Sequence, residues 1–201
     1  MKCKHCGCEI CKKKIKHPNL IQLFELVQSQ FVYGGQKYAQ TETKEATDVL
    51  FDDFGKGWLL GTIAKYVKRY SNLARERDLL KIATYMFILW LKRGFHLKKK
   101  GSYDVINTTV KAKTEFFPVF LDSINEYLES HITITENPLN RIYELLKECN
   151  DTIFMILKEE KLLEIFYLAY YIWNKEIKEK GADEDVFNET KKEKVNNGKN
   201  N

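Results

Sequence analysis

The chain of 201 residues contains few residues that interrupt helices, with three prolines and ten glycines. Its longest apolar runs, 82–91 and 165–173, are about half the roughly 20 residues that a membrane-spanning helix needs. The first twenty residues carry lysines and cysteines where a secretion signal would have an apolar core. We therefore expect a helical, cytoplasmic protein with no membrane partner.

Several common catalytic motifs are also missing. The chain has no G-x-x-x-x-G-K-[ST], no G-x-S-x-G, no H-E-x-x-H and no G-x-G-x-x-G. His96 and His131 lie in different segments without an evident partner. The sequence therefore gives no support for a P-loop enzyme, a serine hydrolase of the common type, a zincin or a dinucleotide-binding domain.

Acidic residues are scarce only at the N-terminus. Positions 1–17 hold six lysines and one glutamate, so this segment accounts for the whole formal net charge of +5. The remaining residues are balanced in charge. We expect the basic N-terminus to be the part of the chain that contacts nucleic acid phosphates, if any does.

Four of the five cysteines lie within nine residues, in the pattern C-x2-C-x-C-x2-C. In a reducing compartment such clustering favours metal binding over disulfides. Two thiolates two residues apart can bind one Zn²⁺, and His5 and His17 are alternative ligands. The alternative is a flexible lysine-rich arm with chance cysteines. We predict a zinc knuckle at 1–17 with ligands Cys3, Cys6, Cys8 and Cys11.

Apolar residues recur at steps of three and four along most of the remaining chain, which predicts an all-α fold of about seven helices. The first helix is expected to begin at Pro18 and to end at Gly34-Gly35, and no internal repeat is evident. Polar residues after Gly181 predict a disordered tail. The expected units are the knuckle at 1–17, a helical domain at 18–98, a helical extension at 99–178 and the tail at 179–201.

The segment 78–92 is apolar on most sides. Such a helix is either central to a bundle or buried in a dimer interface. We expect a homo-oligomer, for which this apolar helix is a candidate seam.

Charged residues at helical spacing indicate a phosphate site. Glu45 and Asp48 lie three residues apart, hence on one helix face, and Asp78 begins another helix. Mg²⁺ takes one or two such carboxylates and completes its shell with water and phosphate oxygens. Lys65 and Arg69 are spaced i, i+4, and Lys81 lies one turn into the helix that Asp78 begins. The alternative is a solvated surface whose charges pair among themselves.

The same stretch resembles a phage-encoded family, the nucleotide kinase-like domain, over about residues 36–92. The matching motifs are Tyr38, then Glu45-Ala-Thr-Asp48-Val49, then Gly61-Thr-Ile-Ala-Lys65-Tyr66-Val-Lys-Arg69, then Asp78-Leu-Leu-Lys81 and Tyr85. The resemblance implies a helical domain of phage or mobile-element type that acts on deoxynucleoside phosphates. It also implies that Tyr38, Lys65, Tyr66, Arg69 and Lys81 bind the nucleotide and that Glu45, Asp48 and Asp78 are catalytic.

A broader likeness is to the all-α nucleotide pyrophosphohydrolases of the MazG type, whose paired acidic helices hold Mg²⁺. Glu42-x-x-Glu45 and Glu45-x-x-Asp48 are similar to the first of those helices. The expected chemistry is Mg²⁺-dependent phosphoryl transfer to a nucleotide or hydrolysis of its pyrophosphate. Two alternatives stay open: a non-enzymatic nucleic-acid-binding adaptor that uses the knuckle, and an inactive nucleotide sensor.

Overall fold

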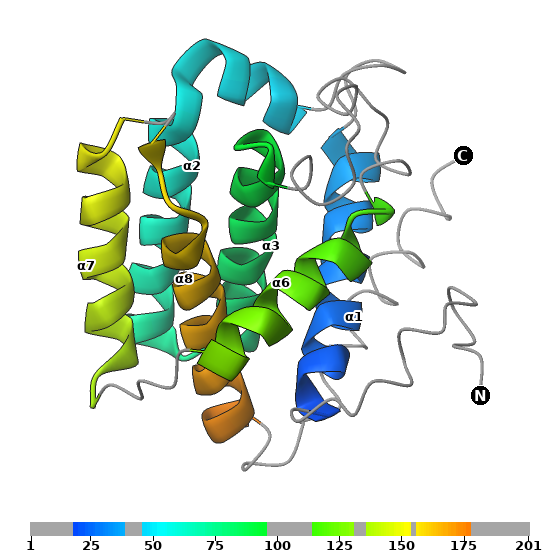
Figure 1. Ribbon diagram of the computed structural model, residues 1–201, viewed down its shortest axis with the longest axis vertical. Helices are drawn as coiled ribbons and strands as arrows, with labels where there is room; N and C mark the ends of the chain where they lie inside the picture. The colour runs from blue at the N-terminus through cyan, green and yellow to red at the C-terminus, as the bar shows by residue number, and fades with distance from the viewer. Residues whose placement is uncertain (1–17, 39–45, 96–113, 131–135, 154–155, 178–201) are drawn as a thin grey trace, which may run out of the picture.

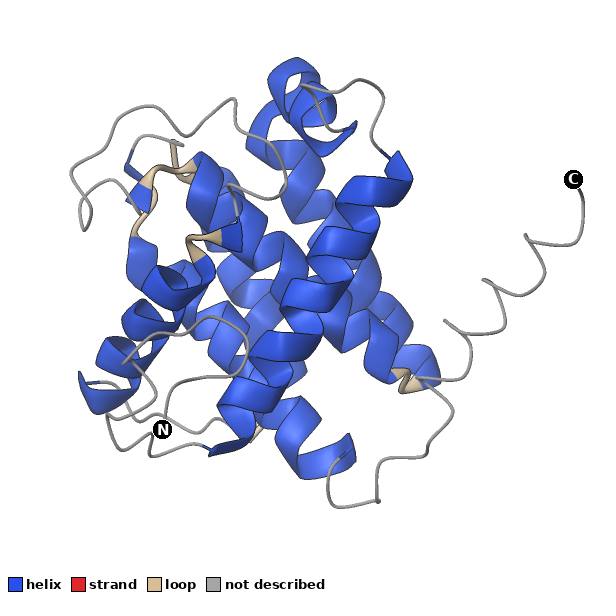
Figure 2. Cartoon of the chain, turned by 90° about the vertical axis from the view of Figure 1, so that its right-hand side faces the viewer, coloured by secondary structure: helices blue, strands red, loops and turns tan. Residues whose placement is uncertain are grey.

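The computed structural model of the protein describes residues 18–38, 46–95, 114–130, 136–153 and 156–177. Within these ranges the chain forms six α-helices and a short π-helical end, with no strand, which confirms the all-α expectation (Figures 1 and 2). None of the described helices is long and apolar enough to cross a membrane. The helices are α1 (Pro18–Tyr38), α2 (Ala46–Leu73), α3 (Glu76–Lys92), α6 (Phe117–Ser130), α7 (Pro138–Asp151) and α8 (Glu159–Ile172), and the π-helix is η3 (Trp173–Ile177).

Four of these helices form an antiparallel bundle, with α2 and α3 as one hairpin and α7 and α8 as the other (Figure 1). Lys56, early in α2, bonds to the C-terminal end of α7, and the Tyr143 hydroxyl donates to the carbonyl of Ala64 at 3.3 Å. Helices α2 and α7 therefore run in opposite directions.

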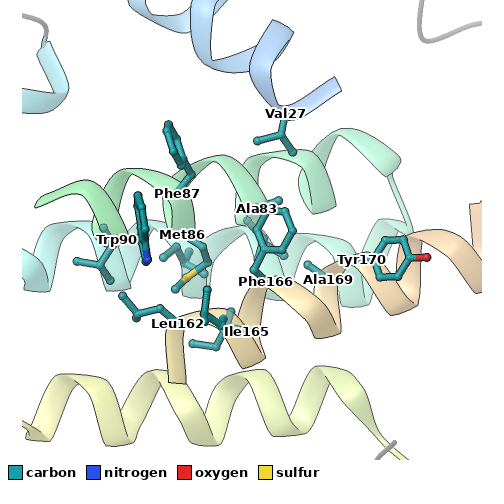
Figure 3. Close-up of a cluster of buried hydrophobic side chains, with 14 of the residues drawn as sticks. Val27, Ala83, Met86, Phe87, Trp90, Leu162, Ile165, Phe166, Ala169 and Tyr170 are labelled. Atoms are coloured by element: carbon teal, nitrogen blue, oxygen red, sulfur yellow. The ribbon is translucent and has the colours of Figure 1, made fainter. Parts of the chain in front are cut away.

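Helix α3 lies at the centre of the molecule, which explains why its sequence is apolar on most sides. It packs against α1, α2 and α8 of the same chain, and Figure 3 shows the seam where α1, α3 and α8 meet. Met86, Phe87 and Trp90 have no exposed surface there. The structure therefore confirms the first interpretation of segment 78–92, that it is central to a bundle. The segment gives no argument for a dimer.

Matching hydrogen bonds fix the register of α3 and α8 at both ends. The indole of Trp90 donates to Glu159 at 2.7 Å, and the indole of Trp173 donates to Glu76 at 2.6 Å. Each glutamate is the first residue of its helix, where its charge also interacts favourably with the helix dipole. Each tryptophan follows the C-terminal part of one helix and bonds to the first residue of the other helix. The two helices therefore run antiparallel.

These two helices also share a local sequence pattern, although no internal repeat is evident along the whole chain. In each, a tryptophan follows the first glutamate of the same helix by fourteen residues, and three buried positions between the two are identical. The identical buried pairs are Leu79 with Leu162, Leu80 with Leu163, and Ile82 with Ile165. The pattern E-x-x-L-L-x-I-x7-W thus marks two helices that pack as near-equivalent partners.

Helices α1 and α6 cover one side of the bundle and complete the aromatic core. Phe24 lies 6.2 Å from Phe117 and 5.2 Å from Phe166, between ring centroids. Phe31 packs edge-on against Phe87 at 5.5 Å. The amphipathic spacing that predicted the first helix is confirmed, because its apolar stripe is the buried face of α1.

Two predicted helix boundaries are wrong. Helix α1 continues through Gly34 and Gly35 to Tyr38, because core packing of Phe31 outweighs a helical-glycine cost of about 1 kcal/mol each. The apolar spacing over 151–178 predicts one helix, whereas α8 begins only at Glu159. Asn137 caps α7, with its side chain accepting from the Asn140 amide at 3.1 Å.

Helix α2 is interrupted at Gly55, whose φ of 63° and ψ of −158° lie in a region that almost only glycine adopts. The interruption separates an arm, Ala46–Phe54, from the long part of α2, and this arm crosses the end of the bundle at the top of Figure 1. The next residue, Lys56, donates to the carbonyls of Cys149 at 2.6 Å, Asn150 at 2.8 Å and Thr152. Its ammonium therefore caps the C-terminal end of α7.

Candidate functional site

Aromatic side chains from α2 and α3 meet along the outer side of this hairpin. The rings of Tyr66 and Tyr85 are stacked, with centroids 5.9 Å apart and an interplanar angle of 17°. Trp58 packs edge-on against Tyr85 at 6.0 Å and 86°. All three side chains are partly buried against the core and partly exposed. They form an aromatic strip that runs along the hairpin.

Two cations lie on the Tyr66 ring. The Lys65 ammonium is 4.6 Å from the ring centroid, and the Arg69 guanidinium carbon is 5.6 Å from it. Such contacts are worth about 0.5–1 kcal/mol at exposed sites, so they position a cation without neutralising it. Lys65 is exposed and contacts no carboxylate within the part of the chain that the structure describes. We call Trp58, Lys65, Tyr66, Arg69 and Tyr85 the hairpin face.

Asp78 lies at the end of the hairpin face that is nearest the connection between α2 and α3. Its Oδ1 lies 3.5 Å from an Arg69 guanidinium nitrogen, and its side chain is 1% exposed whereas that of Arg69 is 42% exposed. The other carboxylate oxygen, Oδ2, is buried and has no hydrogen-bond partner. A buried acceptor without a donor is unfavourable by about 1–3 kcal/mol, which marks this carboxylate as unusual.

Lys81 and Tyr85 share the face of α3 that Asp78 begins. The three residues follow the i, i+3, i+7 spacing of one helix face, and Lys81 and Tyr85 are both partly exposed. The structure therefore brings together five of the residues predicted from spacing and resemblance. These residues are Lys65, Tyr66, Arg69, Asp78 and Lys81.

Asp48, by contrast, lies at the other end of the bundle. Its carboxylate contacts the Lys92 ammonium at 2.7 Å, and the two side chains are 9% and 8% exposed. Lys92 also lies 5.0 Å from the ring of Phe51, one turn further along the arm. Fourteen residues of α3 separate Asp78 from Lys92, which corresponds to about 21 Å. The structure does not bring the two predicted acidic elements together, because sequence spacing does not reveal at which end of a bundle a helix begins.

The structure does not place the remaining predicted residues on the hairpin face. Tyr38 is the last residue of α1. Glu45 and the four cysteines of the predicted knuckle lie outside the described residues, as does the predicted tail. In the part of the chain that is described, no group of three or more His, Cys, Asp or Glu side chains is arranged to hold a metal ion. The zinc and magnesium sites therefore stay predictions.

Two residues were not identified from the sequence: Trp58, on the hairpin face, and Lys92, the partner of Asp48 at the other end of the bundle. Trp58 precedes Lys65 by two helical turns, so its i, i+7 spacing placed both on one face and was a usable signal. The partner of Asp48 had no such signal. Lys92 is distant in sequence and becomes adjacent only because the arm folds back over the end of α3.

A second charged cluster, on α7 and α8, has the character of a structural network. Arg141 binds Glu164 through Nε at 2.8 Å, and Lys161 binds Glu148 at 2.9 Å. These contacts lower the pKa of Glu148, mainly through its hydrogen bond with Lys161. Burial, with the nearby Glu164 charge, raises the pKa of Tyr127 to about 12. Because cations and carboxylates satisfy one another here, the cluster offers no evident ligand site.

Buried Cys149 is the free cysteine of the described chain. Burial raises the pKa of its thiol to about 11, so the thiolate form that reacts is rare at neutral pH. The residue packs in the core of the bundle.

No family model, no curated protein and no solved structure matches the chain. The hairpin face is therefore the basis for a proposed function.

Proposed function

We propose that the protein binds a nucleotide on the hairpin face and that Lys65 and Arg69 hold its phosphate. The observation that carries the proposal is the convergence of two cations on one tyrosine ring, beside further exposed aromatic surface. Aromatic rings bind bases by stacking, and cations bind phosphates by charge-assisted hydrogen bonds. A nucleotide carries both groups.

Both cations on this face have N–H donors available to an anion. Lys65 has no carboxylate partner among the described residues, and its charge is exposed. Arg69 has five N–H donors, and its contact with Asp78, at 3.5 Å, is too long to be a strong hydrogen bond. A phosphate placed between the two side chains would gain a fork of guanidinium donors and an ammonium.

Isothermal titration of the protein with deoxynucleoside monophosphates and triphosphates tests this proposal. Replacing Lys65 or Arg69 with Gln should weaken binding by about 10- to 150-fold, the value of a charge-assisted hydrogen bond. The matched control is Lys147→Gln, which removes one exposed charge from α7 on the other hairpin. Equal weakening in the control would attribute the effect to net charge, and an absence of nucleotide binding would refute the proposal.

Turnover of the bound nucleotide is a second candidate, and Asp78 is the observation that favours it. Its buried Oδ2 has no hydrogen-bond partner, and its Oδ1 lies 3.5 Å from the Arg69 guanidinium. In this proposal Asp78 would hold Mg²⁺, which would supply positive charge to stabilise the reacting phosphate, and catalysis would be positioning plus charge stabilisation. The reaction is phosphoryl transfer or pyrophosphohydrolysis.

Product analysis by anion-exchange chromatography distinguishes these reactions. Purified protein is incubated in Mg²⁺ with each deoxynucleoside monophosphate, with and without ATP, and with each triphosphate. A diphosphate product indicates a kinase, and pyrophosphate with monophosphate indicates a hydrolase. Asp78→Asn should abolish either activity. Nucleotide binding without any product would identify a sensor that does not consume its ligand.

Helix α1, which follows the predicted knuckle in the sequence, begins at the same end of the bundle as Asp78. There the Asn19 amide donates to Asn174 at 2.6 Å, next to the Trp173 that binds Glu76 at the start of α3. We propose that residues 1–17 bind Zn²⁺ and supply cations to an anionic ligand. Elemental analysis of protein purified without added metal should find about one zinc per chain. A content well below half an equivalent would contradict this.

A non-enzymatic adaptor that binds nucleic acid through residues 1–17 remains the rival proposal. Its affinity for DNA or RNA should fall steeply between about 50 and 200 mM salt, because binding releases counterions from the phosphates. Loss of that binding on deletion of 1–17, with no nucleotide binding by the bundle, would favour the adaptor. Light scattering during size-exclusion chromatography tests the predicted homo-oligomer.

A further inference from the structure

The hairpin face has an aromatic pole and a cationic pole. Trp58 and Lys65 lie two turns apart on the same face of α2, about 10 Å along the helix axis. Tyr85 and Tyr66 connect them, with successive ring centroids 6.0 and 5.9 Å apart. The poles are therefore distinct places on one continuous surface.

The cationic pole excludes Tyr66 as the base-stacking surface. One face of its ring is stacked on Tyr85, and Lys65 and Arg69 lie over the ring at 4.6 and 5.6 Å. A base could reach Tyr66 only by displacing the cations that its phosphate needs. Trp58 packs edge-on against Tyr85, is partly exposed and has no cation over its ring among the described residues, so its indole is the aromatic surface open to a ligand.

On the basis of the proposed function, we propose that the ligand is a nucleoside 5′-phosphate bound lengthwise, with its base on Trp58 and its phosphate between Lys65 and Arg69. A sugar ring and one methylene group separate base from phosphate, so the two ends of one such molecule carry the two groups that the poles bind. Additional phosphates would extend past Arg69 towards Asp78. The ligand class is thus defined by an aromatic base at one end and a phosphate at the other, and ribose 5-phosphate alone fills only half of the face.

Intrinsic fluorescence provides a direct test, because the three tryptophans occupy different environments. Trp90 is fully buried and Trp173 is 3% exposed, and both donate to glutamates, whereas Trp58 is partly exposed at the aromatic pole. Stacking of a base on Trp58 should therefore quench the emission saturably with nucleoside 5′-monophosphates. Ribose 5-phosphate and inorganic phosphate should bind without quenching.

Two variants make the test specific. Trp58→Phe should eliminate the quench and retain most of the affinity, and Trp58→Ala should weaken nucleotide binding by about 5- to 150-fold, the range for base–aromatic stacking. Neither should change the affinity for ribose 5-phosphate, which also shows that the variants are folded. Unchanged nucleotide affinity in Trp58→Ala, with Lys65→Gln still weakening binding, would overturn the placement of the base and leave the phosphate site standing. Loss of neither would show that the proposed function itself is wrong.

Discussion

The buried ion pair between Asp48 and Lys92 gives the sharpest prediction about stability. Both side chains are less than 10% exposed, and their charged atoms are 2.7 Å apart. Replacing Lys92 with Met leaves the carboxylate in the same buried position without its ammonium. Removing one partner of a buried pair typically lowers the free energy of unfolding by about 3–5 kcal/mol, because the remaining buried charge has lost the opposite charge that compensated it.

The arm offers the protein one way to reduce this cost. It is joined to the long part of α2 at Gly55, and of its apolar side chains only Phe51 packs, partly buried, against the core, so detachment of the arm would hydrate Asp48 at a modest cost. Lys92→Met should then increase hydrogen exchange in Ala46–Phe54 relative to the rest of the chain. The double variant Asp48→Leu with Lys92→Met should recover much of the lost stability, because it removes both charges together.

Urea unfolding followed by circular dichroism measures these differences, and hydrogen exchange locates them. Lys68→Met is the matched control, since Lys68 is exposed and surface substitutions change stability by about 0.5 kcal/mol or less. A loss below about 1 kcal/mol in Lys92→Met, with unchanged exchange in the arm, would refute the reasoning that Asp48 is primarily held in a structural contact.

Three further predictions concern the backbone, a helix cap and pH. Gly55→Ala should destabilise the protein by about 1–3 kcal/mol in thermal melts, and backbone strain alone should cause the loss, because the added Cβ would meet no atom within 4 Å. Gly57→Ala is equally unobstructed but lies in regular helix, so it should be neutral or stabilising in the same melts. Lys56→Met should reduce the free energy of unfolding by about 1.5–3 kcal/mol, because it uncaps the carbonyls at the end of α7; an unchanged urea midpoint would argue against the cap. The raised pKa of Tyr127 means that the folded protein keeps a proton that the unfolded chain releases above pH 10, so this part of the stability is present below pH 10 and is lost as pH rises towards about 12. Urea midpoints across that range should fall less in Tyr127→Phe than in the wild-type protein.

Much of the helical architecture was predictable because the core-facing residues follow the helical period closely. The stripe from Leu20 to Phe31 is the buried face of α1, and Asn137-Pro138 does begin α7. Glycine was the weakest guide. Two adjacent glycines do not end α1, whereas Gly55 alone breaks α2, because tertiary packing in the first case and a required positive φ in the second decide the outcome.

The candidate site was predictable to the extent that it depends on local spacing. Lys65 with Arg69, and Asp78 with Lys81, lie on single helix faces, and the short connection between α2 and α3 brings those faces together. Asp48 could not be placed in this way. Its position depends on the break at Gly55 and on a contact with Lys92, and neither is expressed in the spacing of the acidic residues.

The central claim is that a nucleotide binds on the hairpin face and not at the Asp48 end of the bundle. Hydrogen exchange measured by mass spectrometry, with and without saturating deoxynucleotide, tests the claim without altering any residue. The account predicts slower exchange in peptides covering Trp58–Arg69 and Asp78–Tyr85, with little change in Ala46–Phe54 and in α7. Protection centred on the arm and Lys92, or on the α7–α8 hairpin, would contradict it.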